Sequence, residues 1–255
     1  MAQYEAFAQY YDTLICNVDY PARAAYFDRV ITAFGGLRGI LLDVACGTGS
    51  LSFELEKLGY DVIGADLSEE MLGIANEKRY EYGSKALFLN QSMQQLDLYG
   101  TVDAAVCALD SVNHITDPDE LIKGFEKVAL FLHPDGVFVF DVNTVYKHEH
   151  ILANETFVYE CDDVYCIWQN EYRPETRCVE IHLDFFEECE DGRYKRQEEA
   201  FCERAYTDEE ICRILRRAGL QVVARYDSDS FDPVRPDSQR VVYVAKHRKS
   251  QEHGG

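Results

Sequence analysis

Glycine and acidic residues near the start of the chain have the types and spacing of a nucleoside site. Gly47 and Gly49 lie in a tight turn after the apolar run 40–44, and Asp66 ends a second apolar run. Two glycines let the backbone approach a bound molecule, and the free amides of the following helix favour a negatively charged group. A carboxylate that ends the neighbouring strand can bind both hydroxyls of a ribose. The pattern therefore predicts binding of a nucleoside with an anionic end.

The elements that must position these residues form a predicted β-α-β unit. Apolar residues recur at helical spacing over 51–58, between the apolar runs 40–44 and 62–65. Such a unit is a right-handed crossover within a parallel sheet. The dinucleotide motif G-x-G-x-x-G would need glycine where the chain has Ser52, and it rarely has an acid such as Asp43 before the turn. NAD or FAD binding is therefore disfavoured.

The same stretch resembles the first two motifs of the S-adenosylmethionine-dependent methyltransferases, which have a doubly wound seven-stranded fold. Asp43, Gly47 and Gly49 match the first motif, and residues 66–68 with Met71 match the second. Small methyltransferases of the bacterial YqeM type are the most similar members, a group whose methyl acceptor the resemblance does not supply. The resemblance implies S-adenosylmethionine as the cofactor.

The resemblance also implies roles for individual residues. Asp66 would bind the ribose, the two glycines the methionine end, and Asp43 would orient the glycine turn or the amino group. Ser92 stands where the family usually has an aspartate that accepts a hydrogen bond from adenine, and Met93 follows it. A serine hydroxyl accepts that bond more weakly. The predicted cofactor-binding residues are Tyr11, Asp43, Ala45, Gly47, Gly49, Asp66, Leu67, Met71, Ser92, Met93, Leu109 and Asp110.

Tyr11 and His114 are the predicted catalytic residues. Tyr11 shares one predicted helical face with Tyr4, Phe7 and Leu14, and the resemblance implies that this segment folds over the cofactor. His114 follows a central strand at its carboxyl end, where open α/β sheets bind ligands. Each residue also has an ordinary explanation: the aromatic side chains can be core residues, and His114 can be a partly buried histidine with satisfied hydrogen bonds.

The predicted fold class is α/β: a doubly wound, Rossmann-like, seven-stranded and mostly parallel sheet with an inserted antiparallel β-meander. The meander is predicted from the alternating runs 156–172, 177–188 and 193–204. Small-molecule members of the resembled family often insert such a sheet as a roof over the active site. The expected domains are residues 1–144 and 207–249 for cofactor binding, 145–206 for a substrate lid, and 250–255 for a tail.

Periodicity and capping residues predict the remaining elements. The following ranges are expected: helices over 21–34, 69–82, 118–132 and 211–218; strands over 86–89, 102–109, 137–141, 220–226 and 240–245; and a turn over 133–136. This order matches the methyltransferase sheet, whose final strand is the lone antiparallel one.

Composition limits the partners and the location. The net charge of −21 would repel a nucleic acid, and no basic patch precedes residues 246–249. The acidic surface either keeps the protein soluble or steers a cationic substrate. Nine cysteines without a C-x-x-C pair argue against disulfides and structural zinc, and no metal site is expected. Without a signal peptide or a bilayer-length apolar run, the protein is expected to be cytoplasmic.

The predicted function is methyl transfer from S-adenosylmethionine to a nitrogen or oxygen of a small molecule. The sulfonium leaves as a neutral thioether, so the enzyme has chiefly to align the nucleophile and exclude water. An amine acceptor must also lose a proton, which His114 or Tyr11 could relay. The alternatives are a catalytically silent cofactor-binding or regulatory protein, an NAD-dependent oxidoreductase, and a methyltransferase of a protein or RNA partner.

Overall fold

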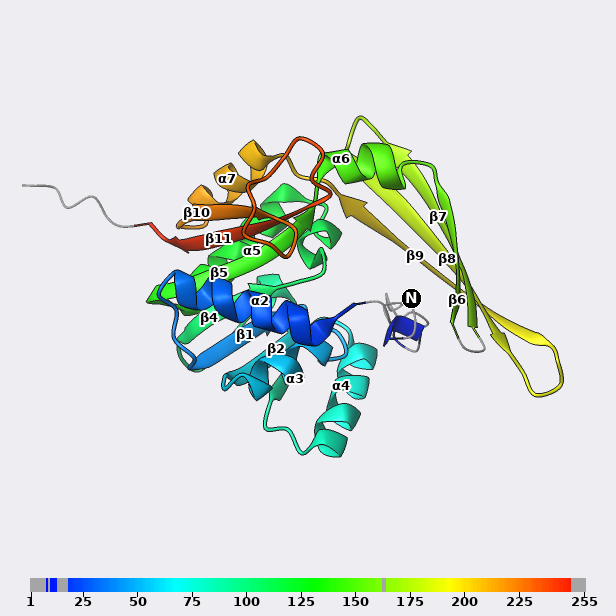
Figure 1. Ribbon diagram of the computed structural model, residues 1–255, viewed down its shortest axis with the longest axis horizontal. Coiled ribbons are helices and arrows are strands. Elements are labelled where there is room, and N and C mark those ends of the chain that lie inside the picture. The colour runs from blue at the N-terminus through cyan, green and yellow to red at the C-terminus, as the bar shows by residue number, and fades with distance from the viewer. Residues whose placement is uncertain (1–7, 9, 13–17, 162–163, 249–255) are drawn as a thin grey trace, which may run out of the picture.

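Two separate sheets organise the chain (Figure 1). The computed structural model describes residues 8, 10–12, 18–161 and 164–248. One sheet has seven strands in the order β10-β11-β5-β4-β1-β2-β3, and the other has four strands in the order β6-β7-β8-β9. In the part of the chain that the structure describes, no helix is both long enough and apolar enough to cross a membrane.

The predicted β-α-β unit opens the large sheet. Strands β1 and β2 pair in parallel, as do β2 and β3. Helix α4 begins where predicted, because the Ser68 hydroxyl accepts a hydrogen bond from the Met71 amide. The elements of this half are α2 (Tyr20–Ala33), β1 (Ile40–Val44), α3 (Ser50–Lys57), β2 (Asp61–Asp66), α4 (Glu69–Tyr82), β3 (Leu87–Asn90) and the short 3-10 helix η1 (Met93–Gln95).

The second half of the large sheet ends in an antiparallel strand. Strand β11 pairs antiparallel with both β5 and β10, whereas β4 pairs in parallel with β1 and β5. This confirms the predicted doubly wound fold. The elements are β4 (Val102–Cys107), the 3-10 helix η2 (Ser111–His114), α5 (Pro118–Phe131), β5 (Leu132–Asn143), α7 (Asp208–Arg217), β10 (Leu220–Asp227) and β11 (Arg240–His247).

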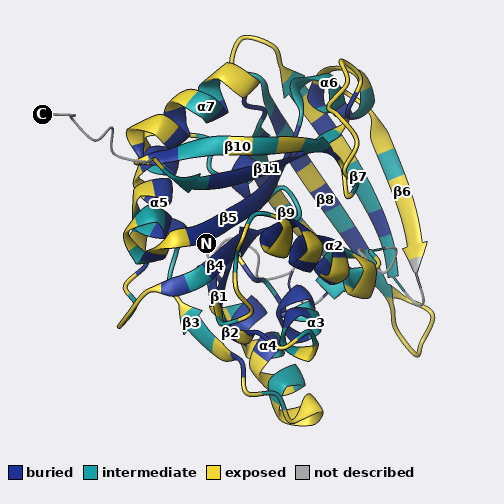
Figure 2. Cartoon of the chain, turned by 60° about the vertical axis from the view of Figure 1, so that its left-hand side comes forward, coloured by how far each residue is buried: buried dark blue, intermediate teal, exposed yellow. Residues whose placement is uncertain are grey.

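Apolar side chains cover both faces of the large sheet. Helices α2 and α3 pack on one face, and α5 and α7 pack on the other. The central strands β5 and β11 are buried along most of their length (Figure 2). Continuous apolar runs such as Val137–Phe140 meet this requirement, because a central strand contacts helices on both sides.

The small sheet follows β5 and precedes α7. Its elements are α6 (Val145–Lys147), the π-helix η3 (His148–Leu152), β6 (Thr156–Cys161), β7 (Val164–Arg173), β8 (Cys178–Glu188) and β9 (Tyr194–Arg204). Alternate residues of β8, from Val179 to Phe185, are buried on one face, which we call the inner face. Phe201 of β9 lies on the same face, since it pairs with Ile181.

The structure corrects three details of the sequence prediction. The run 156–172 forms two antiparallel strands, β6 and β7. The sequence prediction missed the reversal because both halves alternate and nothing in the pattern indicates where the chain turns. Residues 145–152 are helical, which was not predicted. The expected turn at 133–136 belongs to β5, where the pairing shifts from Val102↔Leu132 to Ala104↔Val137 and accommodates the extra residues as a bulge.

Candidate active site

The Asp66 carboxylate points at the glycine turn. Its Oδ2 accepts a hydrogen bond from the Gly47 amide at 2.8 Å, and its Oδ1 accepts one from the Ser68 amide at 2.9 Å. Burial raises the pKa of Asp66, while these amides oppose the shift by favouring the charged form. Each carboxylate oxygen can accept a further hydrogen bond. The arrangement therefore fits the hydroxyls of a ribose.

A cavity lies beside this turn, between the carboxyl ends of β1 and β4. It is narrow and partly open to solvent. The structure brings four predicted site residues together here, namely Tyr11, Asp43, Ala45 and Leu109. The full lining is Tyr11, Tyr20, Asp43, Ala45, Cys46, Thr48, Ser50, Leu51, Ala108, Leu109 and Ser111.

Both strand ends at this cavity have left-handed backbone. Ala45 has φ 57°, and Leu109 and Asp110 have φ 56° and 55°. Non-glycine residues rarely adopt this conformation, and where they do, the surrounding structure must hold them there. Ala45 is exposed, so its neighbours leave the backbone of the first turn open to a ligand.

Gly49 has a packing role. Its φ is 76°, and an added Cβ would lie 2.9 Å from Phe88 and 3.1 Å from Phe53. Its amide donates to the Cys46 carbonyl at 3.0 Å. Contact of Gly49 with a cofactor stays a prediction. Gly47 has open space beside it, because a Cβ added there would have the Tyr11 ring as its nearest side chain, at 3.9 Å.

Asp43 is buried behind the turn and is held by helix α3. Its Oδ2 accepts a hydrogen bond from the Ser52 hydroxyl at 2.5 Å. Burial raises the pKa of Asp43 to about 7, and the negative charge of Asp66 adds to the shift while Ser52 opposes it. The serine that replaces the third glycine of a dinucleotide motif is thus the partner of this acid.

Residues 10–12 join the small sheet to the glycine turn. The Tyr10 ring stacks on Phe185 of the small sheet at 4.9 Å, and its hydroxyl donates to Glu187 at 2.8 Å. Asp12 accepts a hydrogen bond from Thr48 at 2.8 Å and forms an ion pair with Lys78 at 2.5 Å.

Tyr11 lies between these two anchors and lines the cavity. Burial raises its pKa well above the usual value, so the phenol stays protonated at neutral pH and suits a hydrogen-bond donor better than a base. Ala8 and residues 10–12 are helical, while Tyr4, Phe7 and Leu14 lie outside the described residues.

The residues predicted for the adenine end lie at the ends of β2 and β3. These strands are neighbours, with Asp66 opposite Asn90. Ser92 is partly exposed and Leu67 is 56% exposed, so both are accessible to a ligand. Met71 and Met93 are buried, and the Met93 sulfur packs at Gly124 of α5. Their side chains are thus packed in the core, and the Met71 amide already donates to the Ser68 hydroxyl. The predicted contacts of both methionines stay predictions.

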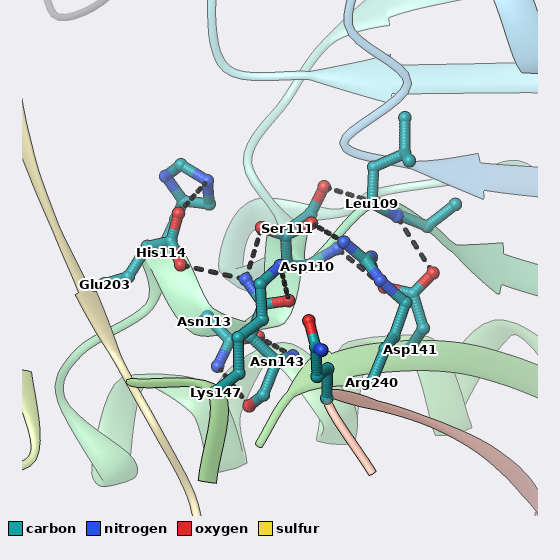
Figure 3. A network of polar contacts seen from close by, with 12 residues as sticks. Leu109, Asp110, Ser111, Asn113, His114, Asp141, Asn143, Lys147, Glu203 and Arg240 are labelled. Atoms are coloured by element: carbon teal, nitrogen blue, oxygen red, sulfur yellow. Dashed lines mark hydrogen bonds and ion pairs between the residues drawn. The ribbon is translucent and has the colours of Figure 1, made fainter. Parts of the chain in front are cut away.

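The Asp110 side chain points away from the cavity into a polar network (Figure 3). Its Oδ1 accepts a hydrogen bond from Arg240 at 2.8 Å, and its Oδ2 accepts one from Asn143 at 2.7 Å. Burial alone would raise the pKa of Asp110, but the charges of Arg240, Lys147 and His114 hold it well below its usual range. The structure gives this side chain a role in holding the loop.

Asp141 of β5 holds Leu109 and Asp110 in their left-handed conformation. Its carboxylate is fully buried and accepts hydrogen bonds from the Leu109 amide at 3.1 Å and the Asp110 amide at 2.6 Å. Arg23 of α2 and Arg240 of β11 donate to the same carboxylate at 2.8 and 2.7 Å. One buried acid thus ties α2, β4, β5 and β11 together.

His114 ends η2 and lies against β9 of the small sheet, outside the lining of the cavity. Its ring is tilted against the ring of Phe201 on the inner face, with 5.0 Å between the centroids, and its Nε2 lies 3.7 Å from Oε1 of the buried Glu203. Ligand atoms of Asp110, His114 and Glu203 lie within 4.8 Å of one another, close enough to share a cation. The expectation that no metal binds therefore stays a prediction.

Sequence reasoning missed most of this network. No local pattern in the sequence indicates that Arg23, Arg240 and Glu203 belong to it. The only signal was the position of Asp141 and Asn143 at the carboxyl end of a buried strand, where ligand-binding residues gather.

The comparisons with known proteins agree with this geometry. Residues 41–136 match the family model described as "Methyltransferase domain". A protein of Geobacillus sp. (strain WCH70) that is named a methyltransferase is 32% identical over 95% of this chain and 99% of its own. YqeM of Bacillus subtilis (strain 168), also named a methyltransferase, is 31% identical over 97% of this chain and 98% of its own.

A solved structure agrees over the whole fold. The crystal structure of an S-adenosylmethionine-dependent methyltransferase from Clostridium acetobutylicum ATCC 824 has a TM-score of 0.86 and 33% identity, covering 96% of this chain and 98% of that one. The chain belongs to the class I S-adenosylmethionine-dependent methyltransferases. It is an enzyme of this kind, near to YqeM over almost its full length.

Arg240 is expected to be needed for stability. Arg240→Met leaves the buried Asp141 and the partly buried Asp110 with one cation fewer, and we expect it to lower the free energy of unfolding by about 3–5 kcal/mol in urea titrations. The control is Arg193→Met, which removes an ion pair of an 84% exposed arginine and should cost under about 0.5 kcal/mol. Equal losses in the two variants would contradict the role of the network.

Asp43 is expected to make stability depend on pH. The pKa of Asp43 is raised to about 7 in the folded state, so the folded protein binds a proton that the unfolded chain does not. The stability that this proton provides is fully present below about pH 4 and is lost as the pH rises through about 7. Asp43→Asn mimics the protonated acid and lacks this loss. Between pH 5 and pH 8 the variant should gain about 1–3 kcal/mol relative to the wild type in urea titrations. A difference that does not change with pH would show that the acid does not titrate there.

Proposed function

We propose that the enzyme methylates an amine of a small molecule bound between the large sheet and the small sheet. The observation that carries this proposal is the acidic inner face of the small sheet. Glu199 and Glu203 alternate with Phe201 on β9, and the Phe201 ring contacts His114 at the end of η2. Carboxylates among apolar side chains suit a small cation with an apolar part better than a neutral hydroxyl compound.

The charge of the segment supports the same acceptor class. Residues 145–206, which we propose as the substrate lid, carry 16 Asp and Glu against 7 Lys and Arg. Such a surface attracts cations and repels phosphates and nucleic acids. A relative named "Glycine/sarcosine N-methyltransferase" from Halorhodospira halochloris, 31% identical over 54% of this chain, is consistent with an amine acceptor. We also propose that the enzyme is cytoplasmic.

The bound cofactor supplies a methyl group on a sulfonium, which leaves as a neutral thioether. We assign Asp66 to the ribose, the amides of the first glycine turn to the methionine end, and Ser92 with the Met93 backbone to adenine. Tyr11 would cover the cavity and donate a hydrogen bond. The buried Asp43 would support the turn from behind without touching the cofactor.

Asp66 is expected to dominate cofactor affinity. Asp66→Ala removes a charge-assisted partner of the ribose and should weaken S-adenosylmethionine binding by more than about tenfold in calorimetry. The matched control is Asp61→Ala at the exposed start of the same strand, which should bind like the wild type. Unchanged affinity in Asp66→Ala, with the variant still folded by circular dichroism, would refute the assignment.

The acceptor class can be tested with a panel of small molecules. Glycine, sarcosine and an amino sugar would be compared with a phenol and a catechol, and S-adenosylhomocysteine would be measured by mass spectrometry. We expect at least about tenfold faster product formation with one of the amines. Product from the hydroxyl compounds alone would overturn the amine proposal.

Two further results would also reject the amine proposal, one from a cell extract supplied with methyl-labelled cofactor and one from the panel. Label that enters only a protein or RNA fraction of a cell extract would indicate a macromolecular acceptor. Cofactor binding without any transfer would favour a catalytically silent regulatory protein.

A further inference from the structure

Two cysteines meet on the outer face of the small sheet, which is the face opposite to the inner face. Cys178 begins β8, and Cys202 lies two residues before the end of β9. In the antiparallel register Cys178 pairs with Arg204 and Glu180 pairs with Cys202, so the two thiols project from one face as diagonal neighbours. The pairing of β8 with β9 thus brings together two cysteines that are distant in the sequence.

The two thiols also interact with each other. Both are free thiols. Burial raises the pKa of the Cys202 thiol to about 12, and the neighbouring Cys178 adds to the shift. Cys202 therefore keeps its proton near neutral pH, which leaves Cys178 as the member of the pair that reacts first.

A small reagent can reach this pair. Cys178 and Cys202 are both partly exposed, whereas Cys46 and Cys166 are buried. Cys189 is exposed as well, but it follows the opposite end of β8, roughly 35 Å from Cys178 along an extended strand. Cys189 is therefore an accessible thiol of the same sheet that cannot bond to either member of the pair.

The pair lies where the small sheet joins the large sheet. Arg177, which precedes Cys178, donates to both carboxylate oxygens of Glu210 on α7, at 2.6 and 2.7 Å. Arg204, the register partner of Cys178, donates to the same carboxylate at 3.3 Å. Strand β9 ends beside the large sheet at this point (Figure 1). A bond between Cys178 and Cys202 would therefore act at the base of the small sheet.

A disulfide between these positions is feasible, but it would be strained. Diagonal neighbours have Cα atoms about 7–8 Å apart, whereas a relaxed disulfide joins Cα atoms about 5.5–6 Å apart. The two strand ends must therefore move together slightly before the bond can close. Strained and accessible disulfides are readily reduced, and disulfides of cytoplasmic proteins are usually transient. We therefore expect a reversible bond.

We propose that Cys178 and Cys202 are a redox-active pair, which a low-molecular-weight disulfide such as glutathione disulfide oxidises reversibly to an internal disulfide. The Cys178 thiolate attacks one sulfur of the glutathione disulfide, whose sulfur–sulfur bond breaks and releases a glutathione thiolate. That thiolate takes the proton of Cys202, and the Cys202 sulfur attacks Cys178 and releases the second glutathione. The pair loses two electrons and two protons, and the reagent gains them as two glutathione thiols. The inference is independent of the methyl acceptor.

Mass spectrometry of the full-length protein tests the proposal. Reduced protein would be incubated with glutathione disulfide at pH 8, alkylated and digested. We expect a linked pair of peptides that contain Cys178 and Cys202, which disappears on treatment with dithiothreitol. The exposed Cys189 is the internal control and should carry a glutathione adduct without such a link. Absence of the linked peptides, with Cys189 modified, would overturn the proposal.

Single variants show whether the two thiols act as a pair. In Cys202→Ser the glutathione adduct should persist on Cys178 at a level at least about tenfold above the wild type, because no neighbouring thiol displaces it. The matched control is Cys189→Ser, which should form the linked peptides like the wild type. Circular dichroism would verify that each variant is folded. Equal amounts of adduct on Cys178 in the wild type and in Cys202→Ser would contradict the role of Cys202.

Discussion

The buried charge of Asp141 is the interaction on which the site depends. A carboxylate taken out of water is costly unless hydrogen bonds and opposite charges surround it, and here two backbone amides and two arginines do so. In return, the acid holds Leu109 and Asp110 in a conformation that they would not adopt alone. The wall of the cavity and the start of helix η2 therefore have their places because this one acid is satisfied.

The network of hydrogen bonds and ion pairs continues outward from Asp141 through shared partners. Arg240 binds Asp141 and Asp110, Asn143 binds Asp110 and Glu203, and Glu203 lies between two histidines. This chain of contacts runs from the core of the large sheet to the inner face of the small sheet. Networks of this kind favour one arrangement, because a partly satisfied buried network is worse than an apolar core. The orientation of the small sheet is thus linked to the geometry of the cavity.

Local sequence signals were enough for the fold and for the approach of Asp66 to the glycine turn. The glycine turn, Asp43 and Asp66 lie within 24 residues of one another, so spacing alone places them. The pairs of Asp141 with Arg23 and Arg240 are 118 and 99 residues apart, and no local pattern indicates them. Alternation along β9 predicts which face of the strand carries Glu203. Which residues that face contacts depends on how the small sheet packs against the large one. The left-handed Ala45 and Leu109 contradict local preference.

Consecutive residues of the N-terminal segment hold two different parts of the molecule. Tyr10 is fixed to the small sheet and Asp12 to the glycine turn, with Tyr11 over the cavity between them. A segment anchored at both ends cannot swing open at one end alone without straining the other. Movement of the small sheet is therefore mechanically linked to the glycine turn, through three neighbouring side chains.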